Sequence, residues 1–150
     1  MIQHRFTDEA HWQEAAGYSR AVRSGSRISV SGTTASAPDG SASTGVPGSD
    51  RSADTYRQTL DALRRGVHAV QQLGGDVRDV VRTRVYLVPG TDWQAAARAH
   101  REVFDAVRPA NTMLYVHSLV GEDLLVEVEI DAELGTGDDS GTSGRPGERP

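Results

Sequence analysis

Two apolar periodicities alternate along this chain, and their order restricts the folds that it can adopt. Between residues 56 and 73, large apolar side chains recur at spacings of three and four, which is the period of a helix with one buried face. Shorter segments, rich in β-branched and aromatic residues, have the length and in part the alternation of half-buried strands. They are residues 18–22, 27–31, 80–88, 111–117 and 124–132. Such a chain must bury a helix face against a sheet.

Turn and capping residues mark the ends of these segments. Ser and Gly at residues 24–26 separate the first two strands and predict a short hairpin. Residues 91–94 (TDWQ) have the spacing of a capping box, in which the Thr hydroxyl and the Gln amide serve as caps, and predict a second helix to about residue 106. We expect Trp93 and Phe104 on this helix to be core residues. The order strands, helix, strand, helix, strands predicts an α+β domain in which residues 80–88 form a central strand.

The ordered domain should be single and should span residues 1–134. A chain of 150 residues can bury one hydrophobic core but is too short for two ordinary ones. Residues 135–150 contain no large apolar residue and are rich in Gly, Pro, Ser and Thr, so we expect a disordered tail. Residues 36–49 have a similar composition between structured segments and predict a long surface loop.

Composition argues against several classes of partner and site. The formal net charge is −5 and the 16 basic residues are scattered, so no nucleic acid is expected to bind. The chain has no cysteine, which excludes disulfides, thiolate nucleophiles and zinc-thiolate sites. No apolar run approaches the roughly 20 residues that span a bilayer, and residues 1–10 carry charges where a signal peptide is apolar. We therefore expect a cytoplasmic protein with no membrane partner.

The last predicted strand divides its side chains between two faces. Residues 124, 126, 128 and 130 share an apolar face, whereas Leu125, Glu127 and Glu129 share the other. If two helices cover the apolar face, Met113, Tyr115 and Leu125 would be exposed together on the opposite face. A partner subunit is the simplest cover for such a surface.

Motifs for nucleophilic and metal chemistry are missing from the sequence. The five histidines show no HxxxH or HExxH spacing, so neither a metal ion nor a cofactor is expected. Ser31 lacks the GxSxG elbow that presents a catalytic serine, and no glycine-rich loop has the strand-to-helix context of a phosphate site. The strand carboxylates Glu127 and Glu129 remain as candidates for chemistry. The alternative is that both are solvated or paired with cations.

Three segments together carry a family resemblance. They are residues 17–22 (GYSRAV), 27–36 (RISVSGTTAS) and 124–132 (LLVEVEIDA), and the intervening helix and strand follow in the same order. Over residues 17–133 the chain resembles the RidA (YjgF-type) family of reactive imine and enamine deaminases. The resemblance implies a subunit like that of chorismate mutase, with a mixed sheet and two helices packed on one face. It also implies a homotrimer with a ligand cleft at each subunit interface.

The resemblance assigns expected roles to individual residues. Glu127 matches a glutamate that helps family members to hold or activate water. Tyr18 and Ser31 match residues that line the family's cleft, and Met113 falls where many members have a small residue or cysteine. These residues are therefore candidates for a site at the subunit interface.

One position departs from the family pattern. Where members that hydrolyse imines read Pro-Ala-Arg-Ser, this chain reads Pro-Ala-Asn-Thr at residues 109–112. In those members the arginine grips a substrate carboxylate, whereas Asn111 cannot offer a charged bidentate fork. The neighbouring candidates Tyr115 and His117 are larger and more aromatic than usual. We expect a different and less anionic ligand, unless Arg82, Arg84 or Arg108 supplies the guanidinium.

The resemblance implies an enzyme that hydrolyses or tautomerises a small imine, enamine or related carbonyl metabolite, with altered specificity. Glu127 would act as base or position water, and Asn111 would polarise a carbonyl or imine. The alternative is a non-catalytic trimer that binds a small metabolite or a protein partner in the same cleft. Ribonuclease activity, suggested by the family's older naming, is disfavoured by the acidic composition.

Overall fold

The computed structural model describes residues 2–8, 11–37, 40–42 and 50–135. The elements along the chain are β1 (Gln3–Phe6), α1 (His11–Ala16), β2 (Ala21–Ser24), β3 (Arg27–Thr34), α2 (Arg51–Gln72), a 3-10 turn (Val77–Asp79), β4 (Val80–Leu87), α3 (Trp93–Phe104), β5 (Ala110–Tyr115) and β6 (Val126–Glu133). Residues 136–150 of the predicted tail (residues 135–150) and most of the predicted loop at residues 36–49 lie outside the described residues. No helix in the described ranges is long and apolar enough to cross a membrane.

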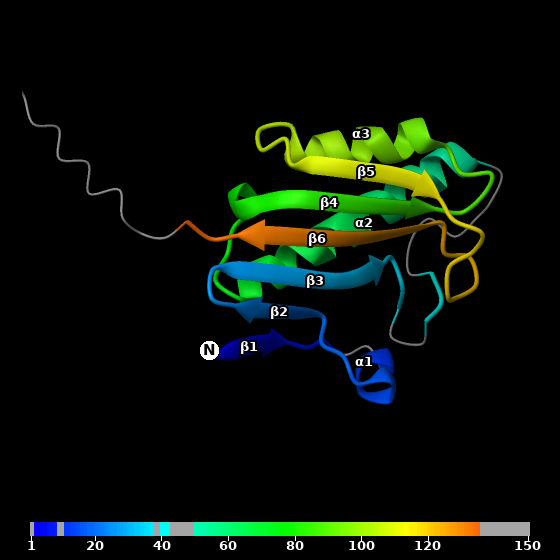
Figure 1. Ribbon diagram of the computed structural model, residues 1–150. Helices are drawn as coiled ribbons and strands as arrows, with labels where there is room; N and C mark the ends of the chain where they lie inside the picture. The colour runs from blue at the N-terminus through cyan, green and yellow to red at the C-terminus, as the bar shows by residue number, and fades with distance from the viewer. Residues whose placement is uncertain (1, 9–10, 38–39, 43–49, 136–150) are drawn as a thin grey trace, which may run out of the picture.

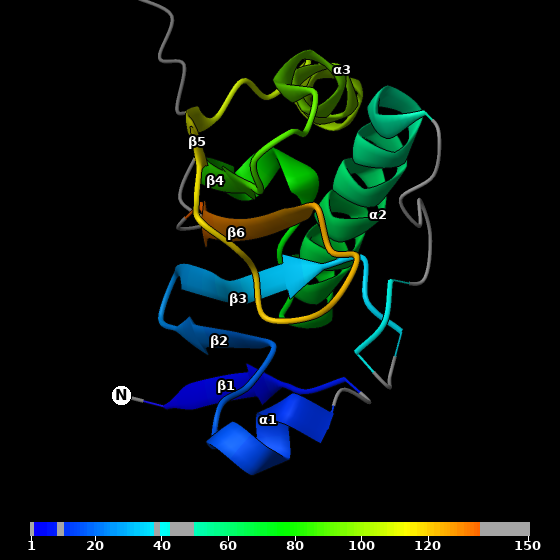
Figure 2. The same ribbon diagram turned by 90° about the vertical axis from the view of Figure 1, so that its right-hand side faces the viewer.

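The strands form one six-stranded mixed sheet in the order β1-β2-β3-β6-β4-β5 (Figure 1). All neighbouring strands are antiparallel except β4 and β5, which are parallel and joined through α3. A parallel pair needs such a crossover connection, whereas antiparallel strands can be joined by a tight turn. Both α2 and α3 cover the same face of the sheet, and the opposite face carries neither of these helices (Figure 2). The predicted α+β fold with two helices on one face is confirmed.

The core lies between α2 and the middle of the sheet. Leu63, Ala69 and Val70 of α2 are fully buried, as are Val128 of β6 and Ile28 of β3. Gly66 allows the helix to approach the sheet, because a Cβ at this position would come within 2.6 Å of Ile130 Cδ1. Burial of this apolar stripe explains the three-and-four spacing in the sequence.

The connection from β4 to β5 differs from the predicted capping box. The cap of α3 is Asp92, whose carboxylate accepts hydrogen bonds from the backbone nitrogens of Gln94 and Ala95 at 2.9 and 3.3 Å. The hydroxyl of Thr91 instead donates to the carbonyl oxygen of Val88. The prediction of Thr91 as cap was wrong, because Asp92 is an equally good capping residue one position closer to the helix.

The hairpin of β2 and β3 is confirmed, with a shifted first strand. Ser24 pairs with Arg27 across a turn in which Gly25 has a φ of +64°. A left-handed residue is what such a two-residue turn requires. β2 begins at Ala21, so Tyr18 lies in the connection between α1 and the hairpin.

The predicted exposed cluster of Met113, Tyr115 and Leu125 does not exist. Met113 and Tyr115 pair in register with Val85 and Leu87 of β4, which are buried core residues on the helix-covered face. Neighbouring strands in register place paired side chains on one face. Leu125 precedes β6, is only 2% exposed and joins the core. The prediction failed because it extended the alternation of β6 to a residue outside that strand and to another strand, β5.

Candidate functional site

Glu127 lies on the open face of the sheet, at the centre of three strands. It is half-buried and pairs with Thr34 of β3 on one side and with Tyr86 of β4 on the other. The register of β3 against β6 shifts between Val30 and Thr33, so that Gly32 lies in a bulge there. A Cβ at Gly32 would collide with Glu127 Oε1. The bulge and the missing side chain together make the space that the carboxylate occupies.

Arg20 brings a buried positive charge to this carboxylate. It is 8% exposed, and its Nη1 donates to the carbonyl oxygen of Gly32 at 2.8 Å and to Thr33 Oγ1 at 3.1 Å. Its Nε donates to Asp8 Oδ2 at 2.9 Å. Gln13 of α1 completes this network, since its amide oxygen accepts from the backbone nitrogen of Arg20 at 3.2 Å. The first residues of the chain thus hold the guanidinium at the bulge beside Glu127.

Burial raises the pKa of Glu127, and the nearby Glu129 carboxylate raises it further, whereas Arg20 lowers it. A carboxylate with a raised pKa is a stronger base than an exposed one, as proton transfer near neutral pH requires. On the same face Arg84 binds Asp131 at 3.1 Å and Glu129 at 3.4 Å. Glu127 has no direct ion pair among the described residues.

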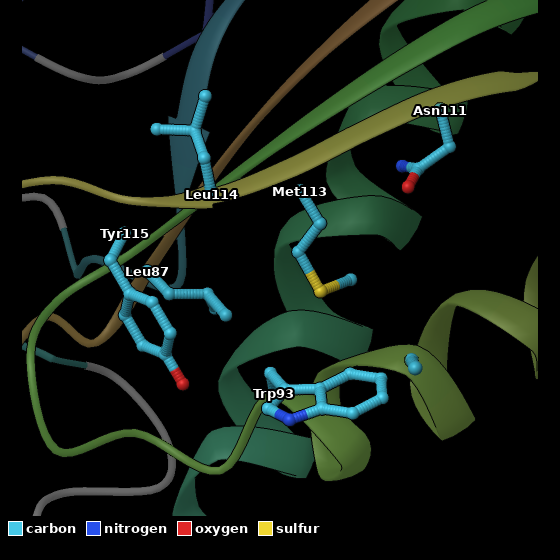
Figure 3. Close-up of a pocket in the computed structure, with 7 residues that line it drawn as sticks. Leu87, Trp93, Asn111, Met113, Leu114 and Tyr115 are labelled. Carbon is cyan, nitrogen blue, oxygen red and sulfur yellow. The ribbon is translucent and has the colours of Figure 1, made fainter.

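A groove opens on the other side of the sheet, between β5 and α3 (Figure 3). It has a volume of about 420 Å³ and is lined by Leu87, Trp93, Ala97, Asn111, Met113, Leu114 and Tyr115. Figure 3 shows the side chains of Met113 and Tyr115 on the same side of β5 as Trp93. Trp93 is 53% exposed, so its prediction as a core residue was wrong, whereas Phe104 is buried as predicted.

Asn111 is the polar residue at one end of this groove. It belongs to a hydrogen-bonded chain of three side chains. Its Nδ2 donates to Thr83 Oγ1 at 3.0 Å, and Thr83 Oγ1 lies 2.8 Å from His100 Nε2. Thr83 is fully buried, and His100 packs on Phe104 with ring centroids 4.9 Å apart. Burial lowers the pKa of His100. Sequence reasoning missed Thr83, although its polar side chain falls on the apolar face of β4.

The predicted site residues fall into two groups within one chain. Asn111, Met113 and Tyr115 lie on the helix-covered face, and Tyr115 donates to the carbonyl oxygen of Thr91 at 3.1 Å. Glu127 lies on the open face. The structure therefore separates the two residues that the sequence placed on one surface.

Of the remaining predicted residues, Ser31 lies on the side of Glu127, whereas His117 belongs to neither group. Ser31 lies in β3 next to Gly32, and its hydroxyl donates to the carbonyl oxygen of Ser19 at 2.8 Å. This bond places the Tyr18 segment beside the bulge near Glu127. His117 follows β5, is exposed and is not among the groove-lining residues.

The three arginines considered as replacements for the family guanidinium lie elsewhere. Arg84 is engaged by two carboxylates, as described above, and Arg108 is exposed and bonded to Asp105. Arg82 lines a separate cleft with Arg27 and Glu133. Arg20, which sequence reasoning missed, is the arginine that lowers the pKa of Glu127. No group of three or more metal-binding side chains occurs in the described part of the chain.

Comparison with known proteins gives the family. A family model described as Endoribonuclease L-PSP matches residues 9–134. The chain belongs to this family. The predicted RidA (YjgF-type) resemblance is thereby confirmed, since solved members of the same fold carry the family name YjgF/YER057c/UK114.

The chain is similar to other proteins over most of its length. An uncharacterized protein of Streptomyces coelicolor is 39% identical over 127 residues, which are 85% of this chain and 89% of that protein. The crystal structure of Rv2704 from Mycobacterium tuberculosis is 36% identical, with a TM-score of 0.73, and the match covers 89% of this chain and 100% of that one. E. coli TdcF with bound serine shares the fold at 22% identity and a TM-score of 0.64, over 79% of this chain and 88% of that one.

Proposed function

We propose that this YjgF-family chain is a cytoplasmic homotrimeric enzyme that hydrolyses or tautomerises a small imine, enamine or related carbonyl metabolite. The observation that carries the proposal is the half-buried Glu127, which is seated over Gly32 with a raised pKa and no direct ion pair among the described residues. A structural carboxylate on a sheet is normally solvated or paired with a cation. A half-buried and unpaired carboxyl group with a raised pKa is suited to accept a proton.

The proposed cleft lies between two subunits. Asn111 and Glu127 are on opposite faces of one sheet, so a small ligand cannot touch both within a single chain. In a cyclic trimer, the groove of one subunit can meet the open sheet face of the next, because the interface joins two different surfaces. Tyr18 and Ser31 would then line the half of the cleft that contains Glu127, and Met113 and Tyr115 the other half.

In the proposed hydrolysis, Glu127 accepts a proton from water as the water oxygen bonds to the imine carbon. The same proton passes to the nitrogen and gives a carbinolamine. Glu127 then moves the hydroxyl proton of the carbinolamine to the nitrogen, the C–N bond breaks as the C=O bond forms, and ammonia and a carbonyl compound are released. For tautomerisation, Glu127 would take a proton from carbon and return it elsewhere on the ligand. Neither reaction requires a metal ion or a redox partner.

The proposal is tested with imines and enamines generated in situ from a panel of amino acids and amino-acid amides, with ammonia release as the measurement. Glu127→Gln should reduce kcat/KM by at least about 100-fold, the usual contribution of a general base. Glu122→Gln is the matched control, because Glu122 is exposed in the loop before β6. Equal rates for wild type and Glu127→Gln would contradict the proposal.

A non-catalytic binding protein is the second candidate. The specific observation that favours it is the groove at Asn111, whose lining residues include no charged side chain to grip a carboxylate. TdcF with bound serine provides a case of a small ligand in a protein of this fold. Saturable ligand binding without turnover, unchanged in Glu127→Gln, would favour this second function.

A further inference from the structure

The amide of Asn111 is fixed at the end of the groove. Its Nδ2 is held by Thr83 Oγ1 at 3.0 Å, and Thr83 is fully buried in β4. Among the described residues no group donates to the side-chain oxygen of Asn111 (Oδ1), although the residue is exposed to the groove. The groove therefore ends in a hydrogen-bond acceptor that a ligand can reach.

The direction of the hydrogen bonds follows from His100. Burial lowers the pKa of His100 and so favours the neutral ring, and in the tautomer with its proton on Nδ1 the Nε2 atom accepts. The Thr83 hydroxyl accepts from Asn111 and has one proton to give, which satisfies His100 Nε2 at 2.8 Å. A flipped Asn111 amide would present its oxygen to a hydroxyl whose proton is already used. With His100 in this tautomer, the chain of three residues keeps the amide nitrogen of Asn111 toward the sheet.

The remaining walls of the groove are apolar and aromatic. Trp93 and Met113 flank it, and Tyr115 lies at the end away from Asn111 (Figure 3). The hydroxyl of Tyr115 is engaged by the carbonyl oxygen of Thr91, so its ring rather than its polar atom is presented. A volume of about 420 Å³ accommodates a small ring compound.

We propose that this groove selects an uncharged ligand. Such a ligand brings an N–H or O–H donor to the side-chain oxygen Oδ1 of Asn111 and an apolar ring to Trp93 and Met113. A carboxylate at that end would face the lone pairs of the Asn111 oxygen and would lose its hydration without a cation in return. The inference rests on the proposed function only in placing the ligand in the same cleft. The ligand class of that cleft is then uncharged aromatic compounds that carry an amide-like N–H or an O–H donor.

Benzamide and benzoate are the matched probes, because they share shape and ring but differ in donor and charge. Binding to the full 15N-labelled chain is followed by NMR at the Trp93 indole and the Asn111 side-chain amide. Benzamide should shift both signals with a Kd on the order of millimolar, as suits a ligand of this size. Benzoate should bind at least about tenfold more weakly, because burying its charge is not compensated.

Three variants complete the test. Asn111→Ala should weaken benzamide binding at least about fivefold through loss of the hydrogen bond. Asn111→Arg should invert the preference toward benzoate, because a guanidinium donates to a carboxylate. Gln94→Ala changes an exposed residue next to Trp93 that does not line the groove, and should leave both affinities unchanged.

The proposal is overturned if benzoate binds wild type as tightly as benzamide, if Asn111→Ala binds benzamide like wild type, or if neither probe shifts the two signals. Its failure is separable from failure of the proposed function. Glu127→Gln should abolish turnover but retain benzamide binding, so binding and catalysis are scored by different variants.

Discussion

At the scale of single residues, the pKa of Glu127 makes its stability contribution depend on pH. Its pKa in the folded chain is raised above the ordinary value of 4.5, first by burial and then by Glu129. Below pH 4.5 Glu127 is protonated in both the folded and the unfolded chain, so its burial as a charged group does not lower the free energy of unfolding. This free energy falls as the pH rises through the folded pKa. Glu127→Gln should therefore be more stable than wild type at pH 7 and equal to it near pH 4. Thermal melts at both pH values measure this difference, and a gain that persists at pH 4 would contradict the assignment.

Arg20 provides a second prediction for the same carboxylate. Since Arg20 lowers the pKa of Glu127, Arg20→Gln should raise it and shift the acidic limb of the activity profile to higher pH. The variant should also be destabilised by about 1–3 kcal/mol, because the carbonyl oxygen of Gly32 loses a buried donor. A 13C NMR titration of the Glu127 carboxyl separates the two effects. Arg78→Gln, which removes an exposed arginine bonded to Asp76, is the control.

The sequence identified Glu127, but it did not identify Arg20, which lowers the pKa of Glu127, or Thr83 and His100, which hold Asn111 in the groove. Glu127 was found because a glutamate on the last strand belongs to a motif and alternates away from the core. Arg20, Thr83 and His100 act through contacts between segments far apart in the sequence, which composition and spacing do not contain. Only Thr83 could have been found from the sequence, because it is a polar residue at a position of β4 that the strand alternation predicts to be buried.

At the scale of elements, the register shift in β3 has a direct consequence for the site. Gly32→Ala would place a methyl group against the carboxylate of Glu127, which is the end of a flexible side chain and can move. We therefore expect a loss of stability below about 1 kcal/mol, together with a large fall in activity. Thermal melts and ammonia release measure the two quantities. Wild-type activity in the Gly32→Ala variant would show that Glu127 does not act from its position over the bulge.

Gln58 links α2 to the segment that enters β6. Its buried amide donates to the carbonyl oxygen of Asp123 and accepts from the backbone nitrogen of Leu125, each at 2.8 Å. Gln58→Leu should cost about 1–3 kcal/mol, because the backbone nitrogen of Leu125 becomes a buried donor without a partner. Faster amide hydrogen exchange at Leu125 is the specific sign, with Gln71→Leu on the exposed face of α2 as control.

The elements themselves were largely predictable, as was the buried face of β6, whereas the face of β5 was not. α2, β4 and β6 were found because each buries one face, and the buried residues recur in the sequence with the period of a helix or a strand. β1 and α1 were missed, since β1 is almost entirely exposed and α1 has only six residues, so neither carries a strong period. The face of β5 was predicted wrongly because it is set by the register of β5 against β4, which arises only in the tertiary structure. An edge strand with polar residues on both faces does not encode that register.

At the scale of the whole molecule, the separation of Asn111 and Glu127 on opposite faces predicts complementation between chains. In a cyclic trimer each chain would give its groove to one cleft and its Glu127 to another. Glu127→Gln and Asn111→Ala chains should each have little activity as pure proteins. After refolding together in equal amounts, about one cleft in four should combine an intact Asn111 with an intact Glu127, so about a quarter of wild-type activity should return.

The control for complementation is a mixture of Glu127→Gln with the double variant Glu127→Gln, Asn111→Ala, which contains no intact Glu127 and should stay inactive. If the two single variants also remain inactive after mixing, while native mass spectrometry shows that mixed trimers have formed, the cleft cannot draw on two subunits. Recovery of activity would instead establish that the open sheet face is the interface that completes the site. The carboxylate and the groove would then be separated within the chain because a neighbouring subunit brings them together.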